Sequence, residues 1–315
     1  MSTMKPLTTP AEPALPTPTE LVDRPEDGVR AERGSPGSFL IRGLRKYTKI
    51  MRVSLIERMT YRGDFFLATI LRFLPMVTTI LLWHAVYEGA QEGAAQPVRL
   101  SGYSLHEMIA YLLLVHISRM FSSMPGLAAG ITRDIREGTL KKYLLQPIDM
   151  IAYLLSYRAA HKVAYIVTSS LPYALLFFLC RNYFDHFPTW ETLGLYVLAL
   201  LLGFLVGFFF EASLGMAGFW FLEVTSFLYI VNTVNFFVSG HMFPLELLPP
   251  FWATLLRMLP FQYLAYFPAA VFLGHIKGFE LVVGLFGEAA WALVFAVLSR
   301  WLYRLGLRQY SAYGG

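Results

Sequence analysis

The sequence predicts an all-α, polytopic membrane protein with six transmembrane helices. Hydrophobic residues make up 56% of the 315-residue chain and charged residues only 15%, whereas soluble domains carry about 45–50% and about 25%. The apolar residues gather into runs of about 20 residues, the length that a helix needs to cross a bilayer. These runs are too long and continuous for the alternating strands of a membrane β-barrel. The six predicted spans are 65–87, 105–126, 163–180, 193–215, 219–238 and 281–302.

The region before the first span divides into two segments. Residues 1–38 are rich in Pro, Thr, Glu and Gly, a composition typical of a disordered tail. This tail lacks the apolar core of a secretory signal peptide. Residues 39–62 place apolar side chains at helical spacing and basic side chains on another face. This pattern favours an amphipathic helix lying in the membrane interface over an ordinary solvated helix.

The distribution of basic residues predicts the orientation of the chain. Seven of them lie between Phe39 and Asp64, and others gather in 131–162 and after residue 299. The alternate loops carry few. The positive-inside rule therefore places both termini and the 131–162 region in the cytoplasm, with the spans in the plasma (inner) membrane. The net charge of +5 needs no nucleic-acid partner, because a cytoplasmic membrane face attracts basic residues.

The cytoplasmic loop 131–148 carries the first irregular element of the chain. Leu140, Tyr143 and Leu144 form a short apolar stripe at helical spacing. Gly138 breaks the chain before the stripe and Pro147 ends it. A short amphipathic helix held between two spans can dock into a groove of a soluble partner. The alternative is a loop helix that rests on the membrane.

The second irregular element is the outer segment 243–274, which is apolar but interrupted by proline. No uninterrupted piece is long enough to span a bilayer, because proline stops helices. Broken apolar helices are tolerated at membrane depth when they are buried or line a cavity. We therefore expect a re-entrant pair of short helices before the last span. The prolines on which this expectation rests are Pro244, Pro249, Pro250, Pro260 and Pro268.

Ionisable residues inside apolar runs are candidate functional residues, because burying a charge in lipid is costly. Arg72, Glu211 and Glu288 lie deep within predicted spans. Interhelical ion pairing is the favoured interpretation, and a proton or ion relay is the alternative. Arg119 and Glu223 lie near cytoplasmic span ends, where pairing or snorkelling accounts for them.

The sequence contains none of the common catalytic or nucleotide-binding motifs. It has no GxxxxGK[ST] phosphate-binding loop, and His106-Glu107 lacks the second histidine of a zinc protease motif. Adjacent Ser239 and His241 do not form a nucleophile motif. The single Cys180 excludes an intramolecular disulfide and a cysteine metal cluster. We therefore predict no catalytic, cofactor or metal residues, and any ATP must bind to another subunit. Gly203 and Gly207 permit close helix packing.

The order of these elements resembles the permease subunit of bacterial type-2 ATP-binding-cassette (ABC) exporters. The stretch from Glu137 to Pro147 resembles the coupling loop of that family, with Arg136 just before it. More specific are SGHMFPLELLPPFW at 239–252, LPFQYLAYFPAAVFLG at 259–274 and the ending GLRQYSAYGG. The resemblance covers 39–315, and the 1–38 tail departs from it.

The resemblance implies a transport mechanism that requires partners. Two permease copies, identical or paralogous, would form the pathway, and separate ATPase subunits carrying ATP and magnesium would dock beneath them. The 131–148 loop and the 39–62 helix would transmit their movement. A hydrophobic, lipid-like or drug-like substrate is expected, and a polysaccharide-exporting ABC permease is an alternative. An ion- or proton-coupled secondary transporter that uses Arg72, Glu211 and Glu288, or a membrane scaffold, remains open.

Overall fold

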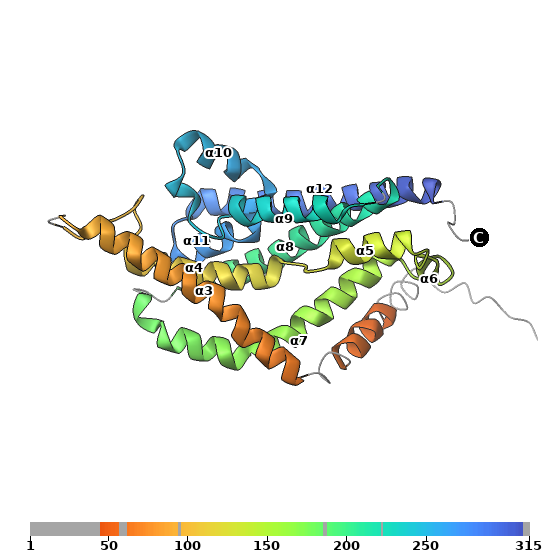
Figure 1. Ribbon diagram of the computed structural model, residues 1–315, viewed down its shortest axis with the longest axis horizontal. Coiled ribbons are helices and arrows are strands. Elements are labelled where there is room, and N and C mark those ends of the chain that lie inside the picture. Colours follow the sequence, from red (N-terminus) through yellow and green to blue (C-terminus); the bar gives the residue numbers. More distant parts are fainter. Residues whose placement is uncertain (1–44, 57–61, 94–95, 185–187, 222, 311–315) are drawn as a thin grey trace, which may run out of the picture. The chain divides into compact units, whose positions relative to one another are not determined.

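The computed structural model describes residues 45–56, 62–93, 96–184, 188–221 and 223–310, and these residues are almost entirely helical (Figure 1). Residues 45–56 form one helix, which is the described part of the predicted interfacial helix. The remaining predicted segment, with the 1–38 tail, lies outside the described residues. The labelled helices are α3 (Arg62–Gln91), α4 (Leu105–Ser122), α5 (Leu127–Arg136), α6 (Lys141–Leu144), α7 (Met150–Leu179), α8 (Trp190–Gly215), α9 (Thr225–Val238), α10 (Pro250–Met258), α11 (Tyr266–Leu273) and α12 (Gly278–Gln309).

Four helical stretches are long and apolar enough to cross a membrane, which makes this a multi-pass membrane protein. They contain the predicted second, third, fourth and sixth spans. The 30-residue α3 covers the first, but the side chains of 62–70 and 72 lie outside the described part of the chain. The four stretches are Leu105–Arg136, Met150–Leu179, Trp190–Phe219 and Gly278–Gln309.

The predicted boundary of the fifth span is wrong. Its helix, α9, starts at Thr225 rather than Phe219 and has only 14 residues. At about 1.5 Å per residue it is ~21 Å long, which is less than the ~30 Å hydrocarbon core. The physical reason is the reversal between α8 and α9. Residues Met216–Phe219 form a 3-10 turn, and there Gly218 packs so closely on Thr132 that an added Cβ would lie 2.9 Å from its methyl group.

Polar side chains at the helix starts fix where two of the spans begin. At α4 the Ser104 hydroxyl accepts a hydrogen bond from the Glu107 N–H (3.2 Å), and the Glu107 carboxylate accepts one from the Ser104 N–H (2.8 Å). This reciprocal pair satisfies amides that lack helical partners. At α7 the Asp149 carboxylate accepts from the Ala152 N–H (2.7 Å). His106-Glu107 therefore belongs to a helix start.

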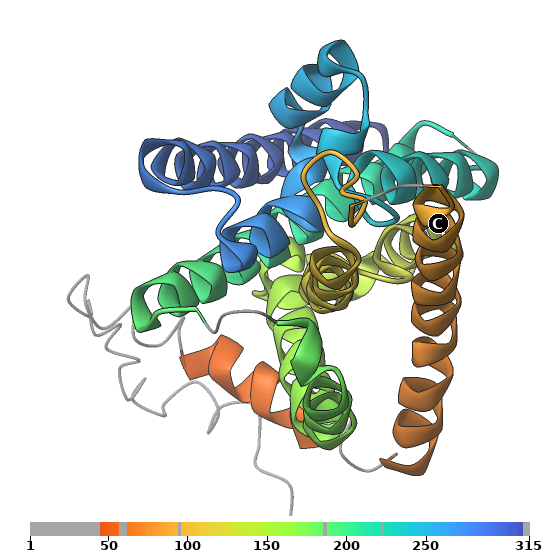
Figure 2. The same ribbon diagram turned by 90° about the vertical axis from the view of Figure 1, so that its left-hand side faces the viewer.

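Helix α8 packs against α4, α5, α11 and α12 (Figure 2). The predicted close packing at its two glycines is confirmed. A Cβ on Gly207 would lie 1.9 Å from the Ser122 carbonyl oxygen, and one on Gly203 would lie 2.9 Å from the Tyr263 carbonyl oxygen. Only glycine lets these backbones approach so closely, as is common between membrane helices.

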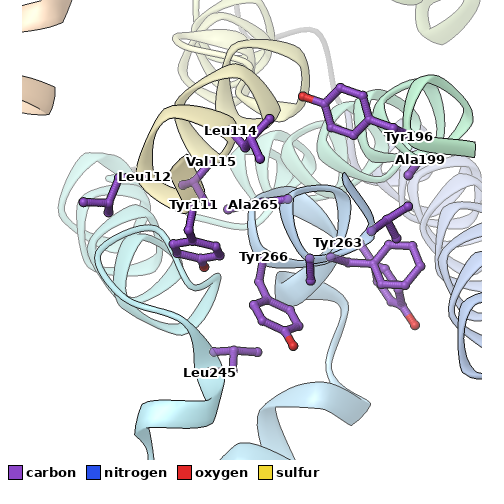
Figure 3. Packing of buried hydrophobic residues seen from close by; sticks show 14 of the residues in the cluster. Tyr111, Leu112, Leu114, Val115, Tyr196, Ala199, Leu245, Tyr263, Ala265 and Tyr266 are labelled. Carbon is purple, nitrogen blue, oxygen red and sulfur yellow. The ribbon is translucent and has the colours of Figure 1, made fainter. Parts of the chain in front are cut away.

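The proline-rich segment 243–274 folds as short helical pieces, as the prolines predict. Pro244 precedes a 3-10 turn at Leu245–Leu247, and Pro249 and Pro250 start α10. Pro260 starts a second 3-10 turn, Pro260–Leu264, that leads into α11. Proline suits these first helical positions because their N–H groups have no helical partner. Helix α11 is mostly buried, and its Tyr266 lies near Tyr111 of α4 and Leu245 (Figure 3).

Candidate functional site

Asp134, near the end of α5, organises the turn that joins α5 to α6. Its carboxylate accepts hydrogen bonds from the Thr139 hydroxyl (2.8 Å) and the Lys142 ammonium (2.8 Å), and the Tyr143 hydroxyl lies 3.4 Å from it. The Asp134 carbonyl also accepts from the Leu140 N–H (2.9 Å). Gly138 has φ of +71°, a conformation that glycine adopts without steric cost. One carboxylate thus holds the whole turn.

The electrostatics of the turn follow from the same contacts. Burial by itself lowers the pKa of Lys142, but the hydrogen bond and the charge of Asp134 outweigh it and leave this pKa raised. Burial raises the pKa of Tyr143 to about 12, although the Lys142 charge opposes the rise. At neutral pH Lys142 is therefore an ammonium and Tyr143 a neutral phenol, which are the forms that their hydrogen bonds to Asp134 need.

The predicted apolar stripe is divided between the interior and the surface. Leu140 is fully buried and Tyr143 is 8% exposed, so both anchor the turn against α5 and α7. Leu140 therefore supports the turn from beneath, and its predicted part in ATPase coupling would be to position the exposed residues. Leu144 and Leu145, at 47% and 85% exposed, carry the outward apolar surface.

The flanking residues of the turn are exposed. Arg136 pairs with Glu223 at 3.8 Å, and both side chains are largely in solvent. Glu137 caps α5 and is exposed. The Pro147 carbonyl accepts a hydrogen bond from Lys46 (2.6 Å), which ties the turn to the helix over residues 45–56.

The predicted second span is broken at residues 123–126, between α4 and α5. The break exposes carbonyl groups that a continuous helix would satisfy internally. Two basic side chains from α7 supply the missing donors. The Lys162 ammonium donates hydrogen bonds to the carbonyl oxygens of Met120 and Ser123, the latter at 2.6 Å. The Arg158 guanidinium donates one to the Pro125 carbonyl oxygen (3.0 Å).

A cavity of about 340 Å³ lies beside this break, and we call it the polar pocket. Arg119 of α4 and Glu211 of α8 both line it, and their charges interact. The Ala128 N–H of α5 donates a hydrogen bond to Glu211. Broken backbone at membrane depth is tolerated where it lines such a cavity. The polar pocket is lined by Arg119, Ser122, Ser123, Met124, Pro125, Gly126, Ala128, Ala129, Gly207, Phe210, Glu211, Leu228, Asn232, Asn235, Phe236 and Leu264.

The three intramembrane residues singled out from the sequence differ in their surroundings. Glu211 lines the same pocket as Arg119, and the charges of the two side chains interact. Glu288 of α12 is fully buried, and neither carboxylate oxygen has a hydrogen-bond partner within the described part of the chain. Within the described part of the chain, Glu288 therefore has no basic partner that would form an interhelical ion pair. Arg72 lies in α3, but its side chain is outside the described residues.

A second polar cluster joins the proline-rich segment 243–274 to the start of α4. The Glu246 carboxylate accepts hydrogen bonds from Arg257 (2.8 Å) and from the Tyr266 hydroxyl. Tyr103 lies 3.5 Å from the same carboxylate. Burial and the Glu246 charge hold the pKa of Tyr103 well above its usual range. The phenol of Tyr103 therefore stays protonated and can donate a hydrogen bond to the Glu246 carboxylate.

Among the described residues, no group of three or more His, Cys, Asp or Glu side chains is placed to hold a metal ion. The described residues combine membrane-length helices, an exposed turn between α5 and α6, and a polar pocket. The long apolar helices define a multi-pass membrane protein. Residues 73–314 match the family model described as "ABC-2 family transporter protein". This match covers most of the chain, so the chain belongs to the ABC-2 family of transporter membrane components, which have no catalytic site of their own. Comparison with curated proteins gave no match.

Proposed function

We propose that this chain is the permease subunit of an ATP-driven ABC exporter. A pair of permeases, identical or paralogous, forms the pathway, and separate ATPase subunits supply ATP and magnesium. Family membership supports this assignment over a secondary transporter or a scaffold. The expected substrate is hydrophobic, lipid-like or drug-like, and a polysaccharide is the alternative within the same architecture.

The observation that carries the proposal is the turn at residues 137–147. Asp134 and the buried Leu140 hold it rigidly, while Leu144 and Leu145 are presented outward. A small apolar surface on a rigid turn fits the helix-in-groove mode of docking. Exposed Arg136 and Glu137 provide a charged rim of the kind that surrounds apolar interface centres. In this proposal the 131–148 segment is the coupling loop.

The proposed topology has six crossings and both termini in the cytoplasm. Helices α3, α7, α8 and α12 and the α4–α5 pair provide five crossings, and the short α9 provides the sixth. The 243–274 segment enters and leaves on the outer side. Its buried α11 and its helix-starting prolines support this placement, because short helices shielded by protein are tolerated at membrane depth. The helix at 39–62 lies in the cytoplasmic interface.

Co-purification of the partner ATPase from native membranes tests the coupling role of the turn. Leu145→Asp places a charge at the centre of the exposed apolar surface, and Gln146→Asp, one residue away, is a charge-matched control. Burying a leucine contributes about 1.5–3 kcal/mol, so Leu145→Asp should reduce ATPase recovery at least about tenfold. The control should reduce it far less. Equal recovery with wild type and Leu145→Asp would refute docking through this turn.

A further inference from the structure

The polar pocket has a size and a lining that the proposed permease role and the coupling turn do not explain. It is formed by four helices, α4, α5, α8 and α9, together with the turn before α11. Its volume of about 340 Å³ falls within the range of small-molecule sites, roughly 300–1,000 Å³. It therefore has room for a headgroup, though not for a whole lipid.

Asn235 is the most informative residue of the pocket wall. Its side chain is 4% exposed, and its Oδ1 atom has no hydrogen-bond partner within the described residues. A buried amide without a partner is destabilising, so a ligand that hydrogen-bonds to it would remove that cost. Asn232, one helical turn earlier, is exposed and lines the same cavity.

The lining of the pocket holds one basic and one acidic side chain. These are Arg119 and Glu211, which interact with each other, and the Arg158 charge also acts on Glu211 from outside the lining. An anion or a cation entering the pocket would gain little net attraction while losing its hydration, which is costly. A hydroxyl group both donates and accepts hydrogen bonds, so it can satisfy an amide, a guanidinium and a carboxylate together.

Large apolar side chains form much of the remaining wall. Phe210, Leu228, Phe236 and Leu264 line it, and Phe236 is 37% exposed. On the same helix, Ile230 and Phe237 are 60% and 50% exposed. An exposed apolar face beside a polar pocket matches a molecule with a polar head and an apolar body.

We propose that the polar pocket binds the neutral, hydroxyl-bearing headgroup of an amphipathic molecule, with Asn235 as its central hydrogen-bonding residue. This inference rests on the proposed transport function and names the chemical class of what is carried. The headgroup contacts Asn235, Asn232 and the Arg119–Glu211 pair, and its ring or carbon face packs on Phe236. A membrane glycolipid and a free sugar share this chemistry.

Cysteine labelling in nanodiscs tests the proposal. The chain has a single cysteine, so Cys180→Ser gives a background to which Asn232→Cys adds one thiol at the pocket. Thr233→Cys, the next residue of α9, is exposed and does not line the pocket, and it serves as the matched control. The readout is the rate of reaction with N-ethylmaleimide. The probes are glucosyl diacylglycerol, diacylglycerol, phosphatidylglycerol and free glucose.

Glucosyl diacylglycerol should slow labelling at position 232 about tenfold when present at about ten times its dissociation constant, because only the free protein reacts. The rate at position 233 should not change. Protection by free glucose as well would assign recognition to the sugar alone, and protection by the glycolipid only would assign it to the whole amphiphile. Adding Asn235→Leu should weaken protection about tenfold.

Three outcomes would overturn the proposal. These are equal protection by diacylglycerol, stronger protection by phosphatidylglycerol, and a thiol at position 232 that stays unreactive before any probe is added. Size-exclusion profiles matching wild type establish that each variant is folded. Recovery of the ATPase is measured on the same variants. If the ATPase co-purifies normally but the glycolipid gives no protection, the pocket assignment alone is refuted. If no ATPase co-purifies even with the wild-type chain, the proposed function is refuted.

Discussion

Replacing glycines of α8 by alanine gives a graded test of its packing. In α8, an added Cβ at Gly194 would meet nothing within 4 Å, one at Gly203 would lie 2.9 Å from the Tyr263 carbonyl oxygen, and one at Gly207 would lie 1.9 Å from the Ser122 carbonyl oxygen. The same change therefore meets three different surroundings on one helix. Backbone atoms cannot move aside as a flexible side chain can, so the cost should rise in that order.

The expected magnitudes follow from these distances. Gly194→Ala should stabilise the protein by about 0.5–1 kcal/mol, because alanine favours the helix and nothing obstructs its methyl group. Gly203→Ala should cost about 1–3 kcal/mol, the usual range for overpacking. Gly207→Ala should cost more than Gly203→Ala, because the methyl group would overlap the Ser122 carbonyl and force α4 away from α8.

Thermal unfolding in one detergent, followed by intrinsic fluorescence, measures the series. At roughly 2–4 °C per kcal/mol, Gly194→Ala should raise the apparent Tm by a few degrees. Gly207→Ala should lower it by more than about 5 °C. If Gly207→Ala were as stable as Gly194→Ala, the close contact between α8 and α4 would be refuted.

Three further substitutions probe the turn, the helix break and a buried histidine. Leu140→Ala should cost about 2–5 kcal/mol of stability, as for a fully buried leucine, and a shift below about 1 kcal/mol in chemical unfolding would contradict its anchoring role. Lys162→Met should cost about 2–5 kcal/mol by removing charged hydrogen bonds to two carbonyls, and a Tm unchanged from wild type would show that the break does not need this cap. Burial, with Arg119 and His116 nearby, lowers the pKa of His241 to about 3. Between about pH 6.5 and pH 3 the unfolded chain therefore binds a proton that the folded chain does not, and stability falls as pH falls. His241→Gln should reduce the loss between pH 7 and pH 5 by ~2 kcal/mol, and an identical pH dependence of Tm would refute the buried, neutral imidazole.

The sequence predicts the elements whose signals are local. Gly138 and Pro147 bracket α6, and the prolines of 243–274 mark where its short helices start, because both residue types act on their own backbone. The family resemblance drawn from the same segments is confirmed by the match over 73–314. The coupling role of the turn and the six-span topology stay predictions.

The features missing from the sequence prediction depend on residues far apart in the chain. The Ser123–Gly126 break carries a local Pro-Gly signal. A prediction based on hydrophobicity alone still includes these residues in the span, because the run stays apolar. Lys162 caps a carbonyl 39 residues away, and no spacing rule predicts such a contact. Asn235 lies in an apolar run without a charge, so only the cavity beside it makes it a candidate binding residue. Leu140 and Leu144 share one stripe on a helical projection, yet tertiary packing buries one and exposes the other.

Helix α5 connects the two candidate sites in a single rigid element. Its first residues, Leu127 to Ala129, begin at the helix break and include two that line the polar pocket. Its last residues include Asp134, which holds the turn between α5 and α6. The helix has 10 residues, so about 15 Å separates its ends. The break at 123–126 interrupts the helix between α4 and α5, so under the proposed function a force on the turn would tilt α5 relative to α4. Under the proposed function, closure of the ATPase subunits would pull on Leu144 and Leu145 and tilt α5. The Ala128 N–H would then move relative to Glu211 and alter the wall of the polar pocket. Coupling would therefore require both an intact Asp134 anchor and a break that can bend.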